Sequence, residues 1–335
     1  MTILVTGGAG FIGSHLVETL LSQGEQIVIL DNFNDFYPSA YKRENISASL
    51  RNPSLTCYET DICNTASCRE IFEKHGIEKV VHLAAYAGVR PSIERPLLYD
   101  EVNCRGTLNL LELSRIYNVK QFIFGSSSSV YGNNKKIPFS EDDPVNEPIS
   151  PYAATKRAGE LYCYNYHHLY KIPIVCLRFF TVYGPRQRPD LAIRKFTELI
   201  DFDQQISMYG DGTTQRDYTF VSDIIDGVVS TLHRQFNFEI INLGNSTPIQ
   251  LRRLIEIIEQ ELGKKAHITM LPEQPGDVHR TYADISKAER LLHYKPKVPI
   301  EQGIRLFADW HKERKKQAEN TSRNETDGIK KFVTF

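Results

Sequence analysis

Short apolar runs alternate with amphipathic stretches along the first half of the chain. The runs cover residues 3–6, 26–31, 80–85, 121–126 and 174–180, and each has the length of a single buried strand. Between most of them, apolar residues recur at helical spacing. Strands that are apolar on both faces and alternate with helices are typical of a parallel sheet covered on both sides. The pattern therefore predicts an α/β fold built on a doubly wound parallel sheet.

The pattern loosens after residue 180. Prolines and glycines there mark loops between shorter helices, which predicts a smaller lobe of mixed α/β structure. We expect residues 1–180 to form the first domain and the chain to return to it within about 215–250. Residues 181–311 are expected mainly to form the smaller lobe. Residues 312–335 are polar and lack apolar periodicity, so we expect a flexible tail there.

The 335-residue chain carries 40 basic and 41 acidic residues, which gives a formal charge of −1. So close a balance argues against nucleic acid or an anionic membrane as the main partner. No apolar run approaches the ~20 residues of a membrane helix, and no secretory-type leader follows Met1, so we expect a cytoplasmic protein. The six cysteines form no C-x-x-C pair, and they predict buried reduced thiols rather than a metal site.

The stretch TGGAGFIG, residues 6–13, follows the first expected strand and opens a helix. Gly8, Gly10 and Gly13 fit G-x-G-x-x-G, and Gly7, Gly10 and Gly13 fit the related G-x-x-G-x-x-G. Glycines there permit a tight turn and close approach of a pyrophosphate, to which the helix start offers free N–H groups. Asp31 ends the next strand, where a carboxylate accepts hydrogen bonds from both ribose hydroxyls and repels a 2′-phosphate. The pattern predicts a Rossmann-type domain that binds NAD rather than NADP.

A second group of residues indicates proton transfer. SPYAATK, residues 150–156, places Tyr152 and Lys156 four residues apart, on one face of a helix. A lysine ammonium and an oxidised nicotinamide would both lower the pKa of the tyrosine, which is otherwise about 10. Four consecutive serines at 126–129 end an apolar strand. They would therefore lie at the carboxyl edge of the sheet, where open α/β sheets bind ligands.

Together these motifs resemble the extended short-chain dehydrogenase/reductases, in particular the NAD-dependent nucleotide-sugar epimerases and dehydratases. The resemblance covers residues 1 to about 310 and includes HLAA, RFFTVYGP, QRDYTFVSD and PGDVHRTYAD. It implies that Ser127 supplies a catalytic hydroxyl, that Tyr152 is the base and that Lys156 is its partner. The cofactor contacts that it implies are Gly7, Gly10, Phe11, Ile12, Gly13, Asp31, Asn32, Asp61, Ile62, Leu83, Ala84, Ala85, Asn103, Tyr152 and Lys156.

The two serines after Ser127 reduce the number of reactions that this family resemblance allows. In similar enzymes, the 4,6-dehydratases and the UDP-glucuronate decarboxylases, acidic residues stand just after the catalytic hydroxyl. Dehydration needs both a general acid and a base, and neither Ser128 nor Ser129 can fill both roles. A floor of neutral hydrogen-bonding groups suits hydride and proton transfer at a single carbon. We therefore expect an epimerase that retains its NAD as a catalyst.

Other residues indicate a UDP-sugar substrate, bound mainly by the smaller lobe. By resemblance, Arg216 and Arg280 lie against a nucleotide diphosphate, and guanidinium groups suit phosphate oxygens. The stretches 82–93 and 178–190 look like UDP-glucuronate 4-epimerases, which implies conversion of UDP-glucuronate to UDP-galacturonate. The residues expected to bind substrate are Arg90, Ser126, Ser127, Ser128, Thr181, Arg188, Arg216 and Arg280.

Three alternatives stay open at this point. The nearest is a 4-epimerase that acts on UDP-glucose or a UDP-N-acetylhexosamine. A second is a UDP-glucuronate decarboxylase, which Ser129 disfavours, and a third is an NAD-binding subunit without catalytic activity. The resemblance also implies a homodimer joined through helices near residues 97–117 and 152–170.

Overall fold

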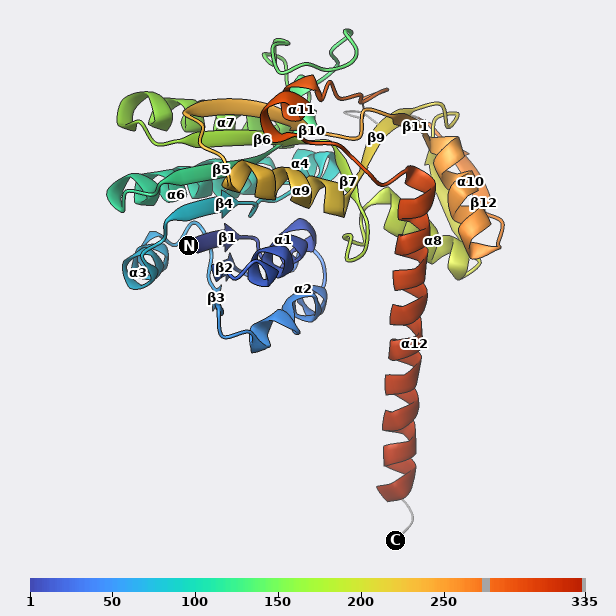
Figure 1. The fold of residues 1–335 in the computed structure, drawn as a ribbon. Coiled ribbons are helices and arrows are strands. Elements are labelled where there is room, and N and C mark those ends of the chain that lie inside the picture. Colours follow the sequence, from blue (N-terminus) through green and yellow to red (C-terminus); the bar gives the residue numbers. More distant parts are fainter. Residues whose placement is uncertain (273–277, 333–335) are drawn as a thin grey trace.

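The computed structural model describes residues 1–272 and 278–332, without the side chains of residue 318 and residues 320–332. Seven strands form its main sheet: β1 (Thr2–Thr6), β2 (Gln26–Asp31), β3 (Leu55–Glu59), β4 (Lys79–His82), β5 (Gln121–Ser127), β6 (Ile174–Phe179) and β10 (Phe238–Leu243). They are parallel throughout, in the spatial order β10-β6-β5-β4-β1-β2-β3 (Figure 1). The strand order reverses beside β1, as in a Rossmann-type doubly wound sheet. The predicted fold class is confirmed.

Helices cover both faces of this sheet. Along β1, Leu4 belongs to one buried apolar cluster, and Ile3 and Val5 belong to the other, because successive side chains of a strand point to opposite faces. The cluster around Ile3 and Val5 includes residues of α1 (Phe11–Ser22) and α9 (Val221–Leu232). The cluster around Leu4 includes residues of α3 (Thr65–His75), α6 (Gly106–Ile116) and α7 (Pro151–Tyr170). Both faces of the sheet are therefore buried.

The second half of the chain adds β10 to the main sheet, next to β6, and otherwise forms smaller elements beside it. A three-stranded sheet contains β7 (Thr181–Tyr183), β9 (Gln215–Phe220) and β11 (Pro248–Gln250), and β8 (Gln205–Tyr209) pairs with β12 (His267–Leu271). The domain boundaries given above stay a prediction, and residues 273–277 of the expected lobe lie outside the described residues. The helices of this half besides α9 are α8 (Ala192–Asp201), α10 (Leu251–Leu262), α11 (Ser286–Leu292) and α12 (Ile300–Phe332).

Short helical elements follow the carboxyl ends of several strands. α2 (Ser39–Ile46) and the 3₁₀ turn η1 (Ser49–Arg51) follow β2. α4 (Val89–Glu94), α5 (Pro96–Tyr99) and the π-helical η2 (Asp100–Arg105) lead from β4 into α6. The 3₁₀ turn η3 (Ser128–Tyr131) follows β5. Of these elements, η1 lies directly before β3 in the chain.

A flexible tail is expected over 312–335, and that flexibility stays a prediction. α12 continues as a helix to Phe332, and residues 333–335 lie outside the described residues. Residues 312–319 consist of Lys, Glu, Arg, Gln and Ala, which have high helix propensity. Intrinsic helix propensity, rather than apolar periodicity, favours a helix in this segment. The middle of this helix is tied to α8, where Asp201 pairs with Lys315 at 2.7 Å and with His311 at 3.1 Å.

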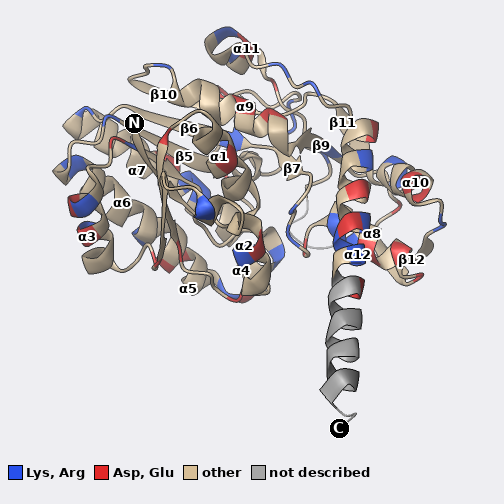
Figure 2. Ribbon diagram, turned by 60° about the horizontal axis from the view of Figure 1, so that its bottom comes forward, with Lys and Arg blue, Asp and Glu red and all other residues tan. Residues whose placement is uncertain are grey.

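Among the described residues, no helix combines the length and the apolar character needed to cross a membrane. Acidic and basic residues are interspersed along α3, α8, α10 and the described part of α12 (Figure 2). The near balance of charge in the sequence is thus also present along these individual helices.

Candidate active site

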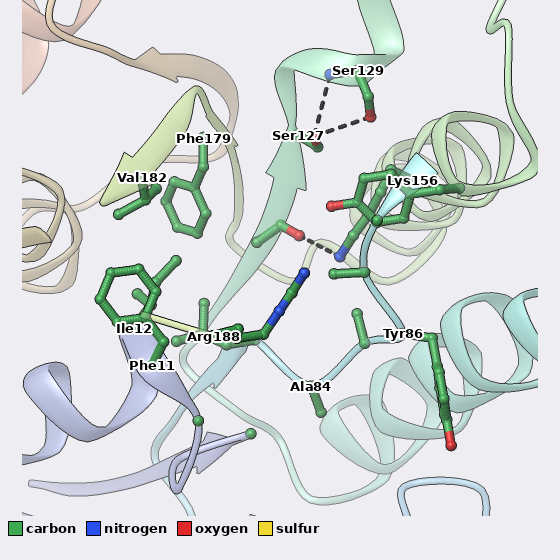
Figure 3. A pocket seen from close by; sticks show the side chains of 18 of the residues that line it. Phe11, Ile12, Ala84, Tyr86, Ser127, Ser129, Lys156, Phe179, Val182 and Arg188 are labelled. Atoms are coloured by element: carbon green, nitrogen blue, oxygen red, sulfur yellow. Dashed lines mark hydrogen bonds between the residues drawn. The ribbon is translucent and has the colours of Figure 1, made fainter. Parts of the chain in front are cut away.

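A cavity of about 450 Å³ lies at the carboxyl ends of the parallel strands (Figure 3). Its walls come from the glycine-rich turn after β1, the loops after β2 and β4, the end of β5 and the start of α7. Open α/β sheets bind ligands at this edge, beside the point where the strand order reverses. The fold thus brings together motifs that are far apart in the sequence.

The glycine-rich turn leaves no room for side chains. A Cβ atom on Gly7, whose φ is +68°, would lie 2.8 Å from the backbone nitrogen of Ala84. A Cβ on Gly13 would lie 2.2 Å from the carbonyl oxygen of Gly7. α1 begins directly after Gly10, which has no side chain to cap the first N–H groups of the helix. This cradle fits the pyrophosphate of a dinucleotide.

Asp31 stands at the end of β2 with its carboxylate buried. It accepts hydrogen bonds from the N–H groups of Phe33 at 2.9 Å and Ala9 at 3.2 Å. The Lys42 ammonium lies 3.6 Å from the same carboxylate and donates to Asn34 Oδ1 at 3.0 Å. Burial is the main cause that lowers the pKa of Lys42, and the Asp31 charge opposes it. A carboxylate in this position fits an adenosine ribose.

Most of the predicted cofactor contacts line the cavity, and two lie just behind it. Asp61 accepts a hydrogen bond from Asn32 Nδ2 at 2.7 Å. Asn103 holds the loop after β4 by bonds to the N–H and carbonyl of Tyr86, at 2.8 and 2.9 Å, and also donates to Thr155 Oγ1 at 3.0 Å. The contacts that line the cavity are Gly7, Gly10, Phe11, Ile12, Gly13, Asp31, Asn32, Ile62, Leu83, Ala84, Ala85, Tyr152 and Lys156.

The three predicted catalytic residues meet in this cavity. Ser127 ends β5, and Tyr152 and Lys156 lie in the first two turns of α7. α7 starts there because the Ser150 hydroxyl accepts the N–H of Ala153 at 3.2 Å and because Pro151 suits the first helical position. Lys156 is almost fully buried, and its ammonium donates to the Gly125 carbonyl at 2.7 Å. The helix start therefore fixes both residues against the end of β5.

Burial sets the acid–base properties of this group. It lowers the pKa of Lys156 from 10.5 to about 8. Burial also raises the pKa of Tyr152, against a hydrogen bond with Ser127 and the charge of Arg188, which both lower it. Ser127 and Arg188 thus favour the phenolate that a base at this position requires.

The hydroxyl of Ser126 has a protein partner. It donates to Glu160 Oε1 at 2.7 Å, and the Glu160 carboxylate is also held by Arg178, at 2.8 and 2.9 Å. Glu160 and Arg178 are both buried. Ser126 lines the cavity, but the expected role of its hydroxyl as a substrate ligand competes with this bond.

The other predicted substrate ligands near the catalytic group line the cavity. Ser128 and Thr181 do so from η3 and β7. Arg188 extends its side chain into the cavity (Figure 3), where it pairs with Asp190 through two bonds of 2.8 and 2.9 Å. Its guanidinium carbon also lies 5.2 Å from the centre of the Phe36 ring. Arg188 is thus held from two sides.

The remaining arginines differ in position. Arg216 lines the cavity, and Arg280 pairs with β9 through Gln215 without lining it. The buried Nε of Arg280 has no hydrogen-bond partner within the described part of the chain. Arg90 is exposed and lies outside the cavity wall, with its guanidinium carbon 4.5 Å from the centre of the Tyr209 ring. Its predicted contact with substrate therefore has the weakest geometric support.

Sequence reasoning missed several residues at this site. Lys42, Phe36 and Tyr86 line the cavity, and Glu160 supports its floor. Lys42 stands beside Arg43 in a polar helix, and nothing in the sequence separates the buried cation from the exposed one. Glu160 could have been noticed, because it lies four residues after Lys156 and so continues the same helix face.

The glycine-rich cradle thus lies beside Ser127, Tyr152 and Lys156 at one end of the parallel sheet, as the motif resemblance implies. Comparison with known proteins specifies the family: the chain belongs to the one described as GDP-mannose 4,6 dehydratase, which residues 4–307 match. The resemblance inferred from the motifs is confirmed.

Individual relatives extend this result. The UDP-glucuronate 4-epimerase of Thermodesulfobacterium geofontis is 44% identical, over 92% of this chain and 96% of its own. A crystal structure of UDP-glucuronic acid 4-epimerase from Bacillus cereus, in complex with UDP-glucuronic acid and NAD, matches with a TM-score of 0.89 and 39% identity. The match covers 93% of this chain and 99% of that one. The structure of UDP-glucose 4-epimerase from Thermotoga maritima, solved with UDP-glucose, matches with a TM-score of 0.87 and 34% identity. The match covers 94% of this chain and 99% of that one.

Proposed function

We propose that the protein is a NAD-dependent 4-epimerase that interconverts UDP-glucuronate and UDP-galacturonate. One observation carries this conclusion: Ser127, Tyr152 and Lys156 share a cavity in which Ser128 and Ser129 follow Ser127 where dehydratases need acids. The relatives named UDP-glucuronate 4-epimerase are more similar in sequence than the UDP-glucose 4-epimerase reported above. That difference supports a uronic acid as the sugar.

The chemistry assigned to these residues is a proton transfer at the C4 oxygen. Tyr152, as phenolate, takes the proton of the C4 hydroxyl, Ser127 holds that oxygen, and the Lys156 ammonium stabilises the phenolate. NAD, when bound, accepts the C4 hydride and later returns it. Once the 4-keto sugar has turned in the cavity, Tyr152 gives the proton back. The hydride returns to C4 and the proton returns to the C4 oxygen, so no external oxidant is consumed.

A uronic acid adds one requirement. Its 4-keto form is a β-keto acid. Such an acid loses carbon dioxide when the bond between C5 and the carboxylate carbon aligns with the π system of the C4 carbonyl. Ser128 and Thr181, with Arg188, are the residues that we assign to hold the carboxylate out of this alignment. Their positions on the wall of the cavity beside the catalytic group support this role.

We assign the diphosphate of the substrate to Arg216 and Arg280. The buried Nε of Arg280 has no hydrogen-bond partner within the described residues. An unpaired buried donor costs free energy unless a ligand accepts its hydrogen bond. Arg216 lines the cavity on the neighbouring strand β9. Arg280 is bridged to Gln215, the residue before Arg216, so the two arginines come from neighbouring segments.

A homodimer in the cytoplasm completes the proposal. Several large apolar side chains of the helices expected to pair are exposed: Leu97 by 84%, Leu161 by 53% and Tyr164 by 53%. Burial in a helical interface between two copies would remove them from water. All six cysteines are free thiols, as suits a reducing compartment.

The experiment that tests this function incubates purified protein with UDP-glucuronate, UDP-glucose and UDP-N-acetylglucosamine separately and identifies the products by NMR. We expect UDP-galacturonate as the main product and slow turnover of the other two sugars. Faster epimerisation of UDP-glucose would favour the hexose epimerase. Release of UDP-pentose as the main product would favour the decarboxylase.

A further inference from the structure

Ser129 bonds to the catalytic serine twice. Its backbone N–H donates to Ser127 Oγ at 3.2 Å, and its hydroxyl donates to the same oxygen at 3.0 Å (Figure 3). The 3₁₀ turn η3 makes this possible, because Ser127 is in extended conformation and Ser128 begins the turn. The side chain of Ser129 is thus directed to Ser127.

The two bonds decide where the Ser127 proton goes. A serine hydroxyl has two acceptor lone pairs and one proton to donate. Ser129 fills both lone pairs, so Ser127 can bond to a further group only by donating. Ser127 and Tyr152 line the same cavity, and a hydrogen bond with Ser127 lowers the pKa of Tyr152, so we take the Tyr152 oxygen as the acceptor of this proton. The direction of bonding therefore runs from Ser129 to Ser127 and then to Tyr152.

We propose that Ser129 is a positioning residue that turns Ser127 into a fixed donor, whose single proton is directed to the Tyr152 oxygen in the sugar-free enzyme and to the C4 oxygen when the sugar is bound. This rests on the roles proposed above for Ser127 and Tyr152. Hydrogen-bonded hydroxyls polarise one another, so donation by Ser129 strengthens donation by Ser127. Ser129 itself does not touch the reacting atoms. Its hydroxyl bonds to Ser127, whereas an acid at this position would exchange a proton with the substrate.

Other charged and titratable groups lie around Tyr152. Lys156 lies one turn along α7, and the Arg188 charge favours the phenolate. Asp190 is paired with Arg188 at 2.8 Å and partly offsets that charge. The Tyr99 ring packs edge-on at 6.3 Å between ring centres, and burial keeps its own pKa high. None of these groups bonds to Ser129, so a change at position 129 acts through Ser127.

The test compares Ser129→Ala and Ser129→Thr with the wild-type holoenzyme. The first readout needs no sugar: ultraviolet absorbance of the phenolate is followed against pH, and the Tyr152→Phe holoenzyme is subtracted to remove the remaining tyrosines of the 17 in the chain. In Ser129→Ala we expect the midpoint for Tyr152 to rise by at least about 0.3 pH unit. In Ser129→Thr, which keeps the hydroxyl, the midpoint should return toward the wild-type value.

The second readout is the pH profile of kcat with UDP-glucuronate. Ser129→Ala should lose activity several-fold at neutral pH, recover at alkaline pH and keep its KM. Ser114→Ala is the matched control, because it removes a buried hydroxyl bond, to the Leu110 carbonyl at 2.7 Å, in α6. Its profile should follow the wild type.

Two results would overturn the proposal. If Ser129→Ala leaves the Tyr152 midpoint unchanged, Ser129 does not act on Tyr152. If it raises KM with an unchanged pH profile, Ser129 is a substrate ligand instead. Absence of turnover of UDP-glucuronate by the wild type would count against the proposed substrate, and the sugar-free titration would still decide the role of Ser129.

Discussion

The hydroxyl of Ser126 donates a hydrogen bond to the buried carboxylate of Glu160, 2.7 Å away. Arg178 binds the same carboxylate from β6, and Arg157 binds it from α7 at 3.0 Å. One serine of the cavity wall is therefore part of an ion-pair network that joins β5, β6 and α7. The network lies directly behind the catalytic residues and fixes the elements that carry them.

This network predicts that substitutions of Glu160 and of Ser126 reduce stability to different extents. Glu160→Ala should reduce the free energy of unfolding by about 3–5 kcal/mol, because Arg178 would remain as a buried charge without its partner. Ser126→Ala should cost about 1–3 kcal/mol, since Glu160 keeps both arginines, and should change the KM for the sugar less than tenfold. Denaturant titrations and steady-state kinetics measure both. Wild-type stability with a strongly raised KM in Ser126→Ala would instead make this hydroxyl a substrate ligand.

Tyr152→Phe should reduce turnover at least ~100-fold, the scale of a lost general base, and leave NAD bound. Tyr183→Phe is its matched control. The Tyr183 hydroxyl is buried and has no hydrogen-bond partner within the described residues, so its removal should leave the rate unchanged and the stability equal or higher. Bound NAD is measured after denaturation of the purified proteins. A rate near that of the wild type in Tyr152→Phe would remove this residue from the mechanism.

Lys156 should make stability depend on pH between about 8 and 10.5. Burial lowers its pKa to about 8 in the folded state. Between these values the unfolded chain binds one proton more than the folded chain, so this group lets stability rise with pH. Lys156→Met should therefore be inactive yet more stable than the wild type at pH 7, by about 1–3 kcal/mol, with an advantage that narrows toward pH 10. An advantage that stays constant across this range would contradict the low pKa.

The pair of Asp31 and Lys42 predicts a change of cofactor preference. Asp31→Ala removes the carboxylate that lies 3.6 Å from the Lys42 ammonium. The ammonium could then pair with the 2′-phosphate of NADP. NAD affinity should fall and NADP affinity should rise relative to it. The double variant Asp31→Ala/Lys42→Ala should lose the gain in NADP affinity. Calorimetric titration of both cofactors checks this, and equal effects of the single and double variants would show that Lys42 plays no part.

The sheet and the cradle were predictable because they rest on local patterns. Apolar runs at strand length, the glycines at 7, 10 and 13 and the spacing of Tyr152 and Lys156 are each visible within a few residues. The comparisons confirmed the family that these patterns indicated. The fold then brings the separate patterns to one edge of the sheet.

Long-range partners were not predictable. Ser126 and Ser129 are alike in sequence, yet one bonds to Glu160 on α7 and the other to Ser127 two residues before it. Arg90 is expected to contact the substrate, and α4 places its guanidinium against the ring of Tyr209 of β8, a neighbour that the sequence does not indicate. Side-chain direction at a strand end depends on the turn that follows and on elements that pack from elsewhere. No residue pattern within the serine run carries that information.

Isotope exchange tests the central claim of C4 epimerisation with retained hydrogen most directly. UDP-glucuronate carrying deuterium at C4 is incubated with the holoenzyme in ordinary water, and the UDP-galacturonate formed is analysed by NMR and mass spectrometry. We expect the deuterium to remain at C4 of the product, because the hydrogen removed from C4 never reaches solvent. Loss of the label to water, or uptake of solvent hydrogen at C5, would contradict the mechanism.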